Sequence, residues 1–268
     1  MDHLIGVAKK VIKNRSGLPF SVYSSYKEQK ISNVPILKPL LIFILSGSKQ
    51  LGHSRSIACS AGSFVFLSNS DQINIRNVPM QQEYFAVLID FENEDFSELP
   101  KSPEPYKKYV QGEINPILAS ALCQFMEFAL IAPTQIMRLR KREILEIIYH
   151  SGHQDITHLV KPPSLTIQVQ SMILNDISND WSVDLIASNL CMSASTLRRK
   201  LKSEGYYIQD IRHRARLGYG LHLLQTTQLH IGMIAEQCGY QSQSRFTEQF
   251  KRLFGMTPRA IRKTKHIE

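Results

Sequence analysis

The sequence predicts a two-domain α+β protein, with an N-terminal antiparallel sheet or small barrel followed by two helices, and an all-helical C-terminal domain. Three observations predict this fold. The chain has 268 residues, which is enough for two domains. Apolar residues form short or alternating runs up to residue 90, and their spacing becomes helical after residue 115. We therefore expect a first domain at residues 1–150, a linker at 151–164 and a second domain at 165–268.

Four short apolar or alternating runs predict the strands of the first domain. They cover residues 40–45, 63–67, 72–78 and 84–89, and turn residues at 46–48 and 61–62 separate them. Short strands at this spacing are typical of an antiparallel sheet or barrel. Pro100, Pro103 and Pro105 then end the region, because proline interrupts regular structure.

Two amphipathic helices are predicted between residues 115 and 149, with a break near Pro133. In one interpretation both helices pack against the barrel. In the other, residues 117–148 supply a homodimer seam, because basic residues flank the apolar stripe. These basic residues are Arg138, Arg140, Lys141 and Arg142.

Composition and charge narrow the class of protein. The chain is 43% hydrophobic and 21% charged, as in ordinary globular proteins. No apolar run approaches the roughly 20 residues of a membrane helix, and the N-terminus has no signal-peptide core. We therefore expect a cytoplasmic protein with no membrane partner. Residues 161–268 hold 15 basic and 8 acidic residues, against 17 and 15 in residues 1–160, and a basic half favours nucleic-acid binding.

The C-terminal domain contains two similar stretches at an offset of 48 residues, which begin at Val183 and Ile231. In each stretch a short amphipathic helix with a central alanine, Ala187 or Ala235, meets a tight turn and a second helix. A small residue lets two helices cross closely, so this pattern predicts a helix-turn-helix. Residues 208–224 form one long periodic helix between the two units, which would fix the spacing of their reading helices.

The second helix of the first unit is expected to lie in the major groove of DNA. Ser193 is its predicted cap, and Leu197 and Leu201 point into the core. The opposite face carries side chains that can hydrogen-bond base edges or phosphates. The predicted DNA-binding residues of this helix are Ser195, Thr196, Arg198, Arg199 and Lys202.

The second unit repeats this arrangement, with Phe246, Phe250 and Leu253 pointing inward. Its predicted DNA-binding residues are Ser242, which is also the cap, Gln243, Ser244, Arg245, Glu248 and Lys251. Amphipathic helices with basic outer faces also occur in bundles that bind nothing. Two units in tandem, in the basic half of the chain, favour DNA reading.

Residues 231–258, which read IGMIAEQCGYQSQSRFTEQFKRLFGMTP, closely resemble the signature of AraC/XylS-type bacterial transcription regulators. The resemblance covers residues 165–262. Its motifs include Ala235 with Gly239, a Ser-x-Ser-x-Phe at 242–246, Phe250 with Phe254-Gly255, and Thr257-Pro258.

The resemblance implies a regulator, usually an activator, which binds double-stranded promoter DNA and contacts RNA polymerase. The sequence departs from the family pattern at two positions. Ser195 is smaller than the residue often found there, and Glu248 stands where a basic residue is common.

The N-terminal segment resembles the regulatory domain of the same family more loosely, through its LSGSKQL and AGSFVFL stretches. This resemblance implies a cupin-like barrel that senses a small molecule or a regulatory protein, but it assigns no effector-binding residue. His53 is the obvious metal candidate of such a barrel, yet no second ligand stands near it, so a surface histidine is the stronger interpretation. The cluster of His150, His153 and His158 receives no role.

An enzyme is not indicated, and we expect neither a cofactor nor a metal. The sequence has no G-x-S-x-G elbow, P-loop or H-E-x-x-H motif. The four cysteines, Cys59, Cys123, Cys191 and Cys238, form no C-x-x-C pair and are interpreted as reduced thiols, mostly in the core. Two alternatives remain open: a repair protein with an alkyl-accepting cysteine, and a regulator controlled only by a partner protein.

Overall fold

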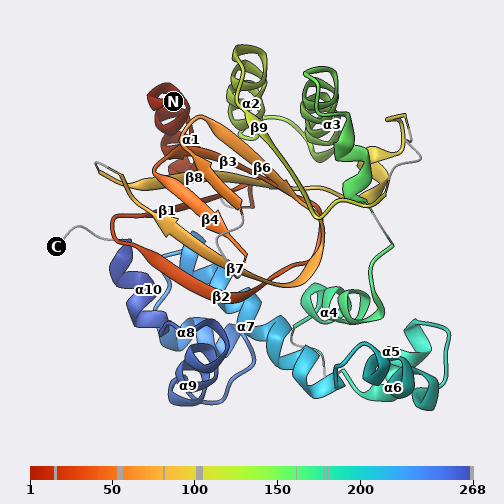
Figure 1. The fold of residues 1–268 in the computed structure, drawn as a ribbon. Coiled ribbons are helices and arrows are strands. Elements are labelled where there is room, and N and C mark those ends of the chain that lie inside the picture. The colour runs from red at the N-terminus through yellow and green to blue at the C-terminus, as the bar shows by residue number, and fades with distance from the viewer. Residues whose placement is uncertain are drawn as a thin grey trace.

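The structure is a computed structural model that describes residues 1–14, 17–52, 57–80, 82–100, 105–160, 162–177, 179 and 181–265. Two antiparallel sheets carry the N-terminal half (Figure 1). The strands are β1 Ser21–Ser25, β2 Gln29–Ile36, β3 Leu40–Ser46, β4 Ser48–Leu51, β5 Ile57–Ser60, β6 Ser63–Leu67, β7 Ser70–Val78, β8 Tyr84–Asp90 and β9 Tyr109–Glu113.

Helices surround the sheets and make up the C-terminal half. They are α1 Asp2–Asn14, α2 Pro116–Phe128, α3 Thr134–His150, α4 Leu165–Asn175, α5 Val183–Asn189, α6 Ala194–Ser203, α7 Ile208–Thr226, α8 Ile231–Gln237, α9 Gln243–Phe254 and α10 Pro258–Thr264. Two 3-10 helices, Asn93–Phe96 and Gln154–Leu159, complete the described elements. None of the helices in the described ranges is both long and apolar enough to cross a membrane.

The two sheets pack face to face and form the unit that we call the double sheet. One sheet has the strand order β1-β8-β3-β6-β9, and the other has the order β2-β7-β4-β5. Strand β3 is buried on both faces, because Ile42 and Ile44 face the second sheet while Leu41 and Phe43 face helices α1, α2 and α3. Because both faces of β3 are buried, its residues are apolar at consecutive positions rather than at every second one.

The predicted strands and the two predicted helices at 115–149 are confirmed. The barrel, however, is not closed: the strands divide between two sheets, in a cupin-like arrangement. Helix α1 was missed, although Leu4, Ala8 and Val11 bury one helical face in the core. The first part of the expected linker is also not free chain, because Ile156 and Leu159 are buried in the core of the double sheet.

Helix α7 links the two C-terminal units, as the sequence predicted. Its nineteen residues span about 28 Å at 1.5 Å per residue. Ile211 and Ala215 lie in the core of α4, α5 and α6, whereas Leu221 and Leu224 lie in the core of α8, α9 and α10. We call these groups the first unit, residues 165–206, and the second unit, residues 229–264.

The double sheet is bonded to the second unit through a buried chain of polar side chains. Gln29 Oε1 accepts hydrogen bonds from Asn77 Nδ2 at 3.0 Å and from Gln225 Nε2 at 3.2 Å. Gln29 Nε2 donates to Thr264 Oγ1 at 2.7 Å. Strand β2 is therefore hydrogen-bonded to α7 and α10 at one buried point. Buried polar groups are nearly always paired in this way in folded proteins.

Lys49 is the most unusual side chain in the double sheet, since only 1% of its surface is exposed. Its ammonium donates to Asn77 Oδ1 at 2.7 Å and to Tyr84 Oη at 3.3 Å, and neither partner is charged. Burial lowers the pKa of Lys49 to about 7, because the charged form loses its hydration.

We predict that Lys49→Met stabilises the fold near neutral pH and removes a pH dependence. Between the folded pKa of about 7 and the ordinary value of 10.5, the unfolded chain holds more protons, so the free energy of unfolding rises with pH. Between pH 7 and 9, the free energy of unfolding of the wild type should rise by about 2 kcal/mol relative to that of the variant. Urea denaturation of both proteins measures this difference, and a constant difference across that range would contradict the low pKa.

Candidate nucleic-acid interface

Each C-terminal unit contains a short helix, a turn and a second helix that are capped as the sequence predicted. Ser193 Oγ accepts from Thr196 N at 3.2 Å at the start of α6, and Ser242 Oγ accepts from Arg245 N at 3.3 Å at the start of α9. Such caps satisfy backbone N–H groups that have no partner within the helix. Ala187 and Ala235 are both buried, as a close crossing of helices requires.

The predicted reading face of α6 is exposed to solvent. Leu197 and Leu201 are buried in the first unit, while Ser195, Arg198, Arg199 and Lys202 are exposed. Thr196 is half-buried, and its hydroxyl accepts a hydrogen bond from Ser193 at 2.9 Å. Among the described residues, no ion pair engages the three basic side chains. They therefore present positive charge to solvent along one side of α6.

Helix α9 presents a comparable but less basic face. Phe246, Phe250 and Phe254 form a row of mutually inclined rings in the core, with ring centroids 5.4 and 4.7 Å apart in successive pairs. Leu253, predicted to point inward, is half-buried. The six predicted DNA-binding residues are all exposed. Glu248 reduces the positive charge of this face, so α9 attracts phosphate less strongly than α6.

The two turns place one equivalent residue in the left-handed backbone region. Gly239 has φ 73° in the second unit, and Cys191 has φ 51° at the position 48 residues earlier. Left-handed backbone costs a residue with a side chain roughly 1–2 kcal/mol. The backbone conformation of the turn thus explains why a glycine stands at position 239. The first unit has a cysteine at the equivalent position.

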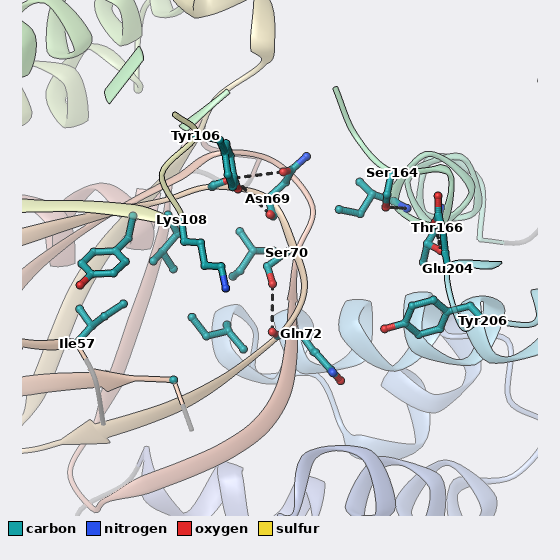
Figure 2. A pocket seen from close by; sticks show the side chains of 17 residues that line it. Ile57, Asn69, Ser70, Gln72, Tyr106, Lys108, Ser164, Thr166, Glu204 and Tyr206 are labelled. Carbon is teal, nitrogen blue, oxygen red and sulfur yellow. Dashed lines mark hydrogen bonds between the residues drawn. The ribbon is translucent and has the colours of Figure 1, made fainter. Parts of the chain in front are cut away.

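Cavities lie between the double sheet and the C-terminal half. One of about 770 Å³ opens beside α1, β1 and the end of α7. Another, which we call the rim cavity, has a volume of about 680 Å³ (Figure 2). Its polar walls include Ser68, Asn69, Ser70, Gln72, Tyr106, Lys108, Ser164, Thr166, Glu204 and Tyr206. A smaller cavity of about 310 Å³ lies beside Lys49, Tyr23 and α7. Sequence reasoning assigned none of these cavities, because their walls come from segments that are far apart in the chain.

The histidine and cysteine candidates gain no catalytic or metal-binding arrangement. His53 lies outside the described residues, and His153 packs edge-on against Phe64 at 5.2 Å. Within the described ranges, no three His, Cys, Asp or Glu side chains are grouped to hold a metal.

Two of the four cysteines are buried, Cys123 is half-buried and Cys191 is exposed. Burial raises the pKa of the thiols of Cys59 and Cys123, and it raises that of Cys238 to about 12. These three thiols are therefore mainly protonated at neutral pH, which lowers their reactivity as nucleophiles.

Comparison with known proteins connects the C-terminal units to a family. A family model described as a helix-turn-helix domain matches residues 186–264. The HTH-type transcriptional regulator AdiY of Escherichia coli K12 is 39% identical over 90 residues, which are 34% of this chain and 36% of AdiY. GadX of the same strain is 30% identical over 143 residues, 50% of this chain and 52% of GadX. The matches thus span about a third to a half of these relatives.

Solved structures resemble the whole fold. Apo ToxT from Vibrio cholerae is 17% identical, with a TM-score of 0.67 over 94% of this chain and 99% of ToxT. A ToxT structure with a bound unsaturated fatty acid is 18% identical, with a TM-score of 0.62 over 91% of this chain and 94% of ToxT. At this identity the likeness shows the fold alone. The resemblance seen in the sequence is confirmed, and so is the order of a cupin-like domain before a helical one.

We predict opposite effects for two alanine substitutions in the second unit. Gly239→Ala should lower the free energy of unfolding by about 1–2 kcal/mol, because alanine resists positive φ. Its Cβ would also meet Arg216 Cζ at 3.2 Å. Gly232→Ala, in the first turn of α8, should raise the free energy of unfolding by up to about 0.5–1 kcal/mol, since alanine favours helix and the exposed side chain of Gln243, whose Oε1 the new Cβ would meet at 3.2 Å, can move aside. Urea denaturation measures both, and equal shifts would contradict the conformational explanation.

Proposed function

We propose that this chain, whose C-terminal domain belongs to the AraC/XylS family, is a transcription regulator that reads promoter DNA through α6 and α9. The observation that carries the proposal is the pair of exposed, capped reading helices joined by one continuous helix. Two such helices can enter successive major-groove segments, which are about 34 Å apart along one face of the duplex.

The two reading helices have different roles in this proposal. Arg198 and Arg199 can each take guanine bidentately, and Lys202 suits a phosphate. On α9, Gln243 and Arg245 can contact adenine and guanine, while Glu248 can accept from cytosine. Because α6 carries no acidic side chain, it supplies most of the electrostatic attraction and α9 most of the discrimination between bases.

The N-terminal domain is proposed to control DNA binding through a small molecule or a regulatory protein. The fatty acid bound to ToxT, which is similar in fold, supports the first of these. The rim cavity and the smaller cavity beside Lys49 support it as well. A regulator that activates transcription would in addition contact RNA polymerase.

A homodimer through α2 and α3 is the proposed assembly. Ile117 of α2 is 66% exposed, Leu139 of α3 is 57% exposed, and Ile131 in the turn between them is 81% exposed, so this segment leaves large apolar side chains uncovered. Ile131→Glu should shift the protein toward the monomer, whereas Ile12→Glu on α1 serves as the control at another exposed isoleucine. Sedimentation velocity over a concentration series measures this, and a wild-type monomer at all concentrations would refute the dimer.

Retention of DNA fragments tests the proposed function. Fragments from upstream of the gene and its neighbours are incubated with the purified chain, excess competitor DNA and a salt series. Selective retention of one fragment, with affinity falling steeply as salt rises, is the expected result. Loss of all binding to the competitor would contradict sequence-specific reading. Transfer of an alkyl group from methylated DNA to a cysteine would instead favour the repair alternative.

We predict that Arg199→Ala weakens binding at a single base position. If Arg199 pairs with guanine, the cost is about 1–3 kcal/mol for the preferred base and almost nothing for the other bases. Lys10→Ala on α1 removes the same charge at an exposed position of the N-terminal domain and should leave base preference unchanged. Affinities for a retained fragment with each base substituted measure the effect. An equal loss for every base would make Arg199 a phosphate contact.

A further inference from the structure

The second unit shares its hydrophobic core with the double sheet. Ile31 of β2 is 4% exposed and lies in the same core as Phe250 and Phe254. Asn33 Nδ2 donates to the backbone oxygen of Leu253 at 2.9 Å, at the end of α9. The backbone N–H of Tyr26 donates to the oxygen of Thr264 at 2.6 Å. Together with the bonds of Gln29, these contacts hold α9 and α10 against β2.

The first unit has a core of its own and meets the double sheet across the rim cavity. Its buried residues, from Val169 to Ala215, all come from the C-terminal half. Figure 2 shows Tyr206 and Ser164 on one side of the cavity, and Ser70 and Lys108 on the other. A cavity rather than a shared core thus separates much of the first unit from the sheet, so its position is less constrained by packing than that of the second unit.

One carboxylate connects this wall to the reading helix α6. Glu204 caps the end of α6, and its carboxylate accepts from Leu165 N at 3.0 Å, Thr166 N at 2.9 Å and Thr166 Oγ1 at 2.6 Å. The start of α4 and the end of α6 are therefore clamped together. A molecule that presses on Ser164 and Tyr206 acts directly on this clamp.

The chemistry of the cavity wall indicates the class of ligand. The carboxylate of Glu204 is engaged by three hydrogen-bond donors at the start of α4, where the helix dipole also favours negative charge. Lys108 is exposed, takes part in no ion pair within the described ranges and points toward the middle of the cavity in Figure 2. Hydroxyls and amides form most of the remaining polar wall, over a floor that includes Ile57 and Ile73.

We propose that the rim cavity binds a small organic monoanion bearing hydroxyl or amide groups, with its negative charge at Lys108, and that occupancy reorients only the first unit. This inference rests on the proposed function and names the site at which DNA binding is regulated. The second unit stays fixed on β2, so a ligand changes the distance and angle between two reading helices rather than freeing the whole DNA-binding domain.

A tryptophan placed in the cavity tests the mechanism without a ligand. Ser70→Trp fills the cavity, Lys108→Trp fills it from an exposed position that tolerates a large side chain, and Ser60→Trp on β5 is the exposed control. Each protein is titrated with the retained fragment, and with fragments in which one half of the binding site is scrambled. The first unit's half-site is the one where Arg199→Ala alters binding.

On the intact site, the affinity of the two cavity variants should differ from that of the wild type at least tenfold. On the fragment whose first-unit half-site is scrambled, the difference should be less than twofold. The control should match the wild type on all fragments. Equal changes on every fragment, or no change on any, would overturn the proposal. Failure of the unaltered chain to bind any fragment specifically would overturn the proposed function instead, and it would be seen before any variant is made.

A matched pair of probes tests the ligand class. Pantothenate carries hydroxyls, an amide and one carboxylate, and panthenol differs by a hydroxymethyl group in place of that carboxylate. Pantothenate should raise the melting temperature of the wild type, and panthenol should not, because only the anion can pair with Lys108. Lys108→Met should remove the shift, and Lys108→Arg should keep it. Equal shifts with both probes, no shift with either, or a shift that survives Lys108→Met would overturn the assigned class.

Discussion

The contact between strand β2 and the second helix-turn-helix unit is the constraint on which the rest of the structure depends. Ile31 fills the core of that unit, and Gln29 is bonded to two of its flanking helices in a fully buried setting. Apolar contact supplies most of the attraction, while the buried amide allows only one register, because a misplaced Gln29 would leave polar atoms without partners. The double sheet therefore orients the DNA-binding half of the chain.

The two halves of helix α7 are held by the double sheet to different degrees. Its second half is packed between β2 and the second unit, so that unit has little freedom. Its first half carries the first unit outward, where α4 and Arg214 of α7 meet β7 beside the rim cavity. A single continuous helix thus connects a unit that is packed on β2 to one that borders a cavity. The difference does not arise in the units themselves, whose helices and turns are nearly equivalent.

Two positions show how the fold accommodates unfavourable chemistry. Cys191 adopts the left-handed backbone that glycine adopts at the matching position of the second unit, because the turn geometry is set by the packing of α5 against α6. Lys49 is held in an apolar interior by two uncharged oxygens, and there its neutral form is favoured. In both cases the surrounding core outweighs the local preference of one residue.

The sequence by itself determined the helix-turn-helix units, their caps and the burial of Leu197, Phe246 and Phe250, because helical periodicity and capping are local properties. It also predicted the central strands, whose continuous apolar runs need no partner to be recognised. Helix α1, the division into two sheets and the packing of residues 154–159 depended on contacts between distant segments. Gln29, Lys49 and Glu204 acquired their roles only in the folded chain, since a polar residue reveals nothing of its partners until the tertiary structure brings them within hydrogen-bonding distance.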